Sequence, residues 1–110
     1  MKKKVTQKEG TMQVENDIEK YLVRQVKKIG GLCYKWVSPG TRGVPDRIVI
    51  FRGSTFFIEL KRPGESLRKN QMKIKSYINQ QGVDVYAIDT KNEVDHFIQE
   101  LKAGDLKHEM

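Results

Sequence analysis

The sequence feature that most restricts the fold is a pair of apolar runs around Arg52-Gly53. The runs are "VPDRIVIF", residues 44–51, and "TFFIELKR", residues 55–62. Runs rich in β-branched and aromatic residues around a short glycine-containing turn are typical of a β-hairpin. Uninterrupted apolar stretches such as "IVIF" indicate buried strands rather than a solvated edge. We therefore expect a well-buried hairpin.

The register of this hairpin brings charged residues together. A two-residue loop at the turn places Asp46 directly opposite Glu59. Lys61 follows Glu59 by two residues and so lies on the same face of the strand. Two opposed carboxylates repel each other unless a positive charge lies between them, and a divalent cation is the usual one. The alternative is a sheet edge whose charges face water, but charges at the end of buried strands are costly, which favours a site.

The rest of the chain predicts three helices and two further strands. We expect a helix over residues 12–29 ended by Gly30-Gly31, a strand over 32–38, a helix capped by Ser66 and running to Gln81, a strand over 83–89, and a helix over 93–102 capped by Thr90. The order α-β-β-β-α-β-α indicates an α/β fold, a mixed central sheet flanked by helices. Residues 1–10 are polar and basic, so we expect a flexible arm before a single domain over residues 11–110.

Composition limits the class of protein. The 110 residues suffice for one domain with a core, and a net charge of +7 favours an anionic partner such as nucleic acid. The single cysteine, Cys33, excludes an internal disulfide and indicates a reducing compartment. No apolar stretch is long enough to span a bilayer, and no signal-peptide core follows the first lysines. We therefore expect a soluble cytoplasmic protein that has no membrane partner.

Several motifs together resemble the VRR-NUC domain of the PD-(D/E)XK nuclease superfamily. They are "SPGTRG" (38–43), "GVPD" (43–46), "ELK" (59–61) and the helix "IEKYLVRQVKKIGG" (18–31). The likeness covers residues 15–93, nearly the whole chain. It implies a restriction-endonuclease-like core and the activity of a metal-dependent, structure-selective DNA endonuclease, of the stand-alone type found in phages and prophages.

The resemblance assigns roles to the hairpin residues. Asp46 and Glu59 correspond to the acidic metal ligands of the family, and Lys61 corresponds to its catalytic lysine. The backbone carbonyl of Leu60 can also face the metal. Hard oxygen ligands suit Mg²⁺ or Mn²⁺, and the lack of a Cys/His cluster argues against zinc. The metal would activate a water that Lys61 orients or deprotonates, so we expect phosphodiester hydrolysis without a nucleotide cofactor.

A glutamate of the first helix joins the site in this family. Our choice is Glu19, because it lies at the edge of the apolar stripe and eleven residues before Gly30, as in similar resolvases. Glu15 is the alternative, since it lies one turn earlier and points in nearly the same direction.

Gln71 interrupts an apolar helical stripe formed by Leu67, Ile74 and Ile78. An amide on a buried face needs a polar partner. Similar nucleases place a glutamine there, against the lysine and a metal-bound water. The resemblance therefore adds Gln71 to the expected catalytic residues.

Basic residues around the proposed site are candidates for contacts with DNA phosphates. They are Lys35, Arg42, Arg62, Arg68 and Lys69. No recognition helix or zinc finger is evident, so we expect recognition of DNA shape, such as a four-way junction, rather than of base sequence. Similar small resolvases act as pairs of subunits, which implies a homodimer. The alternatives are a catalytically silent nucleic-acid-binding module, a sequence-specific restriction endonuclease and a structural phage protein.

Overall fold

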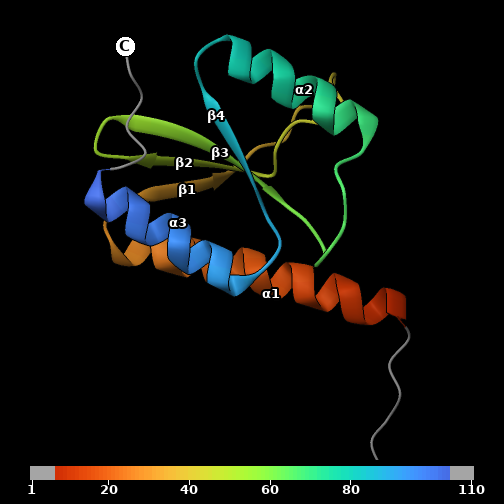
Figure 1. Ribbon diagram of the computed structural model, residues 1–110, viewed down its shortest axis with the longest axis horizontal. Coiled ribbons are helices and arrows are strands. Elements are labelled where there is room, and N and C mark those ends of the chain that lie inside the picture. Colours follow the sequence, from red (N-terminus) through yellow and green to blue (C-terminus); the bar gives the residue numbers. More distant parts are fainter. Residues whose placement is uncertain (1–6, 105–110) are drawn as a thin grey trace, which may run out of the picture.

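The computed structural model describes residues 7–104. The elements are α1 (Gln7–Lys28), β1 (Leu32–Lys35), β2 (Arg47–Phe51), β3 (Ser54–Leu60), α2 (Lys69–Gln80), β4 (Asp84–Ile88) and α3 (Lys91–Ala103). The four strands form one sheet in the spatial order β1-β2-β3-β4, in which only the β3–β4 pair is parallel. The predicted α/β class and the α-β-β-β-α-β-α order are thus confirmed (Figure 1).

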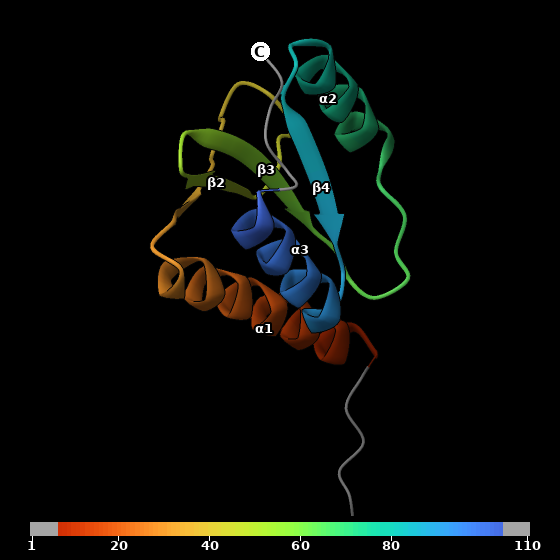
Figure 2. The same ribbon diagram turned by 60° about the vertical axis from the view of Figure 1, so that its left-hand side comes forward.

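The helices cover the two faces of the sheet unequally. Helices α1 and α3 lie side by side on one face, and α2 lies on the other side next to β4 (Figure 2). The core fills the space between α1, α3 and the sheet, and its largest fully buried side chains include Phe56, Leu22 and Ile58. Helix α2 has no buried residue, so it is held much less firmly than α1 and α3.

The hairpin has the predicted register. Arg52 and Gly53 both have positive φ, at 48° and 83°, which is typical of the two-residue type I′ turn whose twist matches that of the flanking strands. The first pair across the turn is Phe51 with Ser54, and the last pair of the ladder is Arg47 with Ile58. The same register, continued by one residue, brings Asp46 to Glu59.

Two helices begin elsewhere than expected. Helix α1 starts at Gln7, so residues 7–10 of the expected basic arm are helical, while residues 1–6 lie outside the described part of the chain. Helix α2 starts at Lys69 with Arg68 as its N-cap, so the prediction that Ser66 caps this helix is wrong. The reason is local, because the side chain of Gln71 accepts the Arg68 N–H and so satisfies a free donor of the first turn.

The cap of the last helix was predicted correctly. The Thr90 hydroxyl accepts the N–H of Glu93 at 3.1 Å, and Gly104 ends α3 in the left-handed conformation. Within residues 7–104, no helix is long and apolar enough to cross a membrane.

Candidate active site

Two carboxyl groups meet at the end of the β2–β3 hairpin. The N–H of Asp46 donates to the carbonyl of Ile58 at 3.0 Å, which extends the ladder and places Asp46 across from Glu59. The side chain of Glu59 is 3% exposed. Burial, and then the hydrogen bond and negative charge of Asp46, raise the pKa of Glu59 to about 9. In the absence of a cation, Glu59 is therefore protonated at neutral pH and shares its proton with Asp46.

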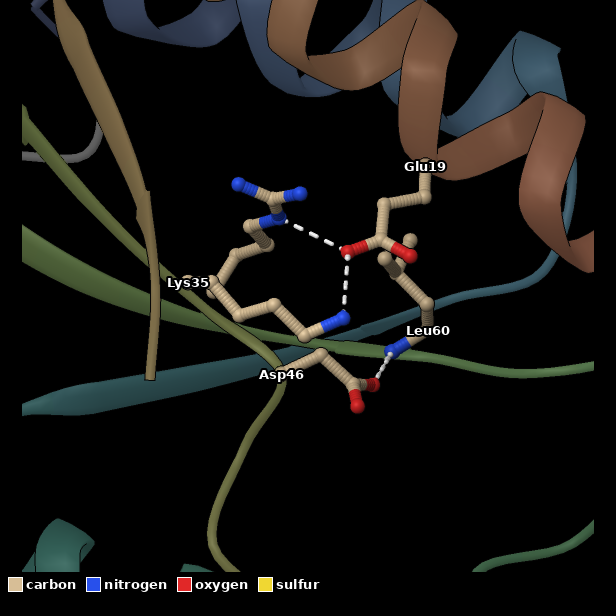
Figure 3. A network of polar contacts seen from close by, with 5 residues as sticks. Glu19, Lys35, Asp46 and Leu60 are labelled. Atoms are coloured by element: carbon tan, nitrogen blue, oxygen red, sulfur yellow. Dashed lines mark hydrogen bonds and ion pairs between the residues drawn. The ribbon is translucent and has the colours of Figure 1, made fainter. Parts of the chain in front are cut away.

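A backbone group holds the carboxylate of Asp46 in place. The N–H of Leu60 donates to Oδ2 of Asp46 at 2.8 Å (Figure 3). Asp46 precedes β2 and Leu60 ends β3, so the bond ties the two strands together where the charged residues gather. The carbonyl of Leu60, which the sequence analysis expects to face the metal, belongs to the same residue as this N–H. The Asp46 carboxylate is thus oriented before any ligand binds.

Lys61 is buried beside these carboxyl groups without bonding to them. Its side chain is 7% exposed, and its Nζ has no hydrogen-bond partner among the described residues. Its charge acts against the rise in the pKa of Glu59 and adds, after the hydrogen bonds of Asp89, to the lowering of the pKa of Asp89, so it lies near both groups. A buried ammonium without a partner is costly. Lys61 therefore has three donors available for an anion or a water.

The glutamates of α1 have different surroundings. Oε2 of Glu19 lies 2.7 Å from Nε of Arg47 and 3.8 Å from Nζ of Lys35 (Figure 3). Glu15 makes no such ion pair among the described residues, and its pKa is raised by burial and by the nearby charge of Asp46. Glu15, the alternative candidate for the site glutamate of this helix, thus lies toward Asp46. Glu19, the candidate chosen from the sequence, is instead part of an ion-pair network with Arg47 and Lys35.

Arg47 was not among the residues that the sequence indicated. It follows Asp46 directly, and its side chain is 19% exposed while that of its partner Glu19 is 18% exposed. A strand that alternates its faces sends Arg47 toward α1 and Asp46 toward Glu59. The alternation of strand faces predicts from the sequence which way Arg47 points. It does not identify Glu19 as the partner, because that depends on how α1 packs against the sheet.

Gln71 has a structural role at the start of α2. Its Oε1 accepts the N–H of Arg68 at 2.8 Å. The expected contact with Lys61 is not made, since Nζ of Lys61 is without a partner in the described part of the chain. A catalytic role for Gln71 stays a prediction.

The basic residues expected to bind DNA lie in four places. Arg42 lies on the loop between β1 and β2, while Arg68 and Lys69 lie at the start of α2, and all three are exposed. Lys35 faces Glu19, and Arg62 lies 3.8 Å from Glu65. Their charges reach the site, since the charge of Arg68 acts against the rise in the pKa of Glu59 and the charge of Arg62 acts against the rise in the pKa of Glu15. Their contacts with DNA stay predictions.

The donor set suits a hard divalent cation. Asp46 and Glu59 present adjacent oxygen ligands, which would repel each other once Glu59 loses its proton, and a divalent cation can replace that proton. Over residues 14–104, no three Asp, Glu, His or Cys side chains are gathered into a metal-binding cluster. A cation held here would therefore complete its shell with backbone carbonyl, water or substrate oxygens, as Mg²⁺ commonly does.

Comparison with known proteins identifies relatives of this chain. No family model matches it. The protein "Putative nuclease p44" of Acyrthosiphon pisum secondary endosymbiont phage 1 is 44% identical over 79 residues, which cover 71% of this chain and 85% of that protein. A solved structure of a VRR_NUC domain is similar with a TM-score of 0.73 and 26% identity, over 77% of this chain and 94% of that one.

Proposed function

Because the chain belongs to the VRR-NUC family of nucleases, we propose that it is a metal-dependent DNA endonuclease whose catalytic centre is formed by Asp46, Glu59 and Lys61. The observation that carries this proposal is the unpartnered Nζ of Lys61, buried beside two carboxyl groups that share a proton. Such an arrangement is unfavourable for stability, and perturbed groups of this kind are typical of functional sites.

The residues that would hold the metal are Asp46, Glu59 and the carbonyl of Leu60, with Glu15 from α1 in place of Glu19. When bound, Mg²⁺ or Mn²⁺ would neutralise charge on the scissile phosphate and lower the pKa of a water. Glu59 must lose its proton to act as a ligand, since it is protonated at neutral pH. The Leu60 N–H keeps Asp46 in position throughout.

Lys61 would act on the attacking water or on the phosphate. Its Nζ makes no bond that must be broken first, so its donors can orient the nucleophile or stabilise the charge that develops on the phosphate. In either role, Lys61 serves the chemical step rather than metal binding.

We propose branched DNA, such as a four-way junction, as the substrate and a homodimer as the active form. The net charge of +7 and the exposed Arg42, Arg68 and Lys69 near the site support binding to a phosphate backbone. Exposed apolar side chains on β1 and β2 support pairing of two copies, namely Leu32 at 45%, Tyr34 at 58% and Ile50 at 37% exposure.

One experiment tests the activity and its substrate together. Purified protein is given labelled four-way junction, 5′ flap, duplex and single-stranded DNA with Mg²⁺, Mn²⁺ or EDTA, beside an Asp46→Asn control. We expect cleavage of the branched substrates that needs the metal and is lost in the variant. Equal cleavage in excess chelator would overturn the metal-dependent mechanism. Tight DNA binding without cleavage under any condition would instead indicate the catalytically silent module.

A further inference from the structure

Gly43 lies against the first turn of α2 through main-chain atoms alone. A Cβ at this position would lie 2.4 Å from the carbonyl oxygen of Asn70 and 3.0 Å from the N of Gln71. Both neighbours are backbone atoms, which cannot rotate away as the end of a side chain can. Gly43 also has a φ of +88°, a conformation that other residues adopt at a cost. Only glycine fits this contact without displacing the loop or the helix.

This contact joins two basic segments that flank the site. The loop between β1 and β2 carries exposed Arg42, and the start of α2 carries exposed Arg68 and Lys69. The charge of Arg68 reaches Glu59, so the first turn of α2 lies beside the carboxyl pair. The loop runs directly from Gly43 to Asp46, and Pro45 within it is fully buried. The loop is therefore anchored to the site at one end and to α2 at Gly43.

Little else holds the N-terminal end of α2. None of its residues is buried, and its packing against the sheet is on β4. A helix with so few buried contacts is positioned mainly by its few close contacts with other segments. Among the glycines of residues 30–82, Gly43 is the one at which an added Cβ would come closest to the backbone of another segment.

Building on the proposed function, we propose that Gly43 is a positioning residue for DNA, because its main-chain contact sets the spacing between the Arg42 loop and the Arg68-Lys69 turn. Phosphate contacts determine how a protein is placed on DNA. Relief of a 2.4 Å contact needs a shift of about 1 Å, and a misplacement of about 1 Å can cost about 100-fold in rate. DNA affinity and cleavage should therefore depend on Gly43, while metal affinity should not.

The test is Gly43→Ala with two matched controls. Gly40→Ala changes the same loop at a position with open space, and Gly53→Ala adds a side chain at a φ of +83° with nothing within 4 Å. For each variant, affinity for a labelled four-way junction is measured in EDTA, and Mn²⁺ affinity is measured by calorimetry without DNA. We expect Gly43→Ala to weaken DNA binding at least fivefold and both controls less than twofold. Mn²⁺ affinity should change less than twofold throughout.

Three results would overturn the inference alone while leaving the nuclease proposal intact. One is DNA affinity of Gly43→Ala within twofold of an active wild type. Another is an equal loss in Gly53→Ala, which would assign the effect to backbone strain. A fall in Mn²⁺ affinity that parallels the fall in DNA affinity would also contradict it. A wild type without affinity for DNA would overturn the proposed function and this inference together.

A measurement on the wild type keeps the inference testable if Gly43→Ala does not fold. Amide hydrogen exchange is compared with and without junction DNA. DNA should slow exchange in residues 40–43 and in residues 69–72 together, while the Arg52-Gly53 turn is unchanged. Slower exchange in only one of the two segments would show that they do not act as one unit, and would overturn the inference.

Discussion

Nε of Arg47 lies 2.7 Å from Oε2 of Glu19, and both side chains are about four-fifths buried. The pair links α1 to the start of β2, directly beside Asp46. The charges of Arg47 and Lys35 already neutralise the Glu19 carboxylate through Oε2, which weakens it as a metal ligand, and giving up the bond would leave the Arg47 guanidinium without its partner in a partly buried place. Glu15 has no competing ion pair in the described residues and lies near Asp46.

The first prediction separates these two glutamates. Glu15→Gln should weaken Mn²⁺ binding at least tenfold, because it removes a ligand charge beside Asp46. Glu19→Gln should leave Mn²⁺ affinity within about threefold, and it should lower the free energy of unfolding by about 1–2 kcal/mol because it breaks a charge-assisted hydrogen bond. Calorimetric titration and urea unfolding measure the two effects. The reverse pattern would make Glu19 the ligand, as expected from the sequence alone.

The second prediction concerns the unpaired ammonium. Lys61→Met keeps an unbranched side chain that is one atom shorter and removes a buried charge that has no hydrogen-bond partner among the described residues, so the melting temperature in EDTA should rise. Cleavage should fall at least 100-fold, while Mn²⁺ affinity is kept. Single-turnover kinetics and calorimetry on the same preparation measure both. If Lys61→Met cleaves DNA at the wild-type rate, Lys61 has no role in the chemical step and is only a structural residue.

The third prediction concerns pH and the metal-free protein. The pKa of Glu59 is about 9 in the folded chain and 4.5 without perturbation, so above pH 4.5 the folded state binds more protons than the unfolded state does. This contribution to stability is complete below pH 4.5 and is lost as the pH rises toward 9. Because of Glu59, the melting temperature in EDTA should therefore fall as the pH is raised from 4.5 toward 9. Glu59→Gln should abolish this part of the slope, and an unchanged slope would contradict the raised pKa.

The fourth prediction separates the two roles of Gln71. Gln71→Leu removes the acceptor of the Arg68 N–H and should lower the free energy of unfolding by about 1 kcal/mol. Gln71→Glu keeps an acceptor at the start of α2, so its melting temperature should match the wild type. If the amide also donates to the site, both variants should cleave slowly. Wild-type single-turnover cleavage by Gln71→Glu would restrict Gln71 to capping.

Much of the fold and half of the candidate site follow from local rules. The two-residue turn at Arg52-Gly53 and the alternation of strand faces determine the hairpin register, and the register brings Asp46 to Glu59. The cap at Thr90 also depends on neighbours within one turn. Such features are encoded by residues close in sequence, so the sequence alone predicted them.

Only the tertiary structure decided which residues those elements meet. Glu15 and Glu19 lie on one helical face, and their difference arises because docking of α1 places Arg47 against Glu19. The buried Lys61 without a partner and the approach of Gly43 to Asn70 likewise join distant segments. Sequence periodicity gives the direction of a side chain relative to its own helix or strand. The partner that it finds depends on how these elements pack, because the ion pairs and close contacts form between segments far apart in the chain.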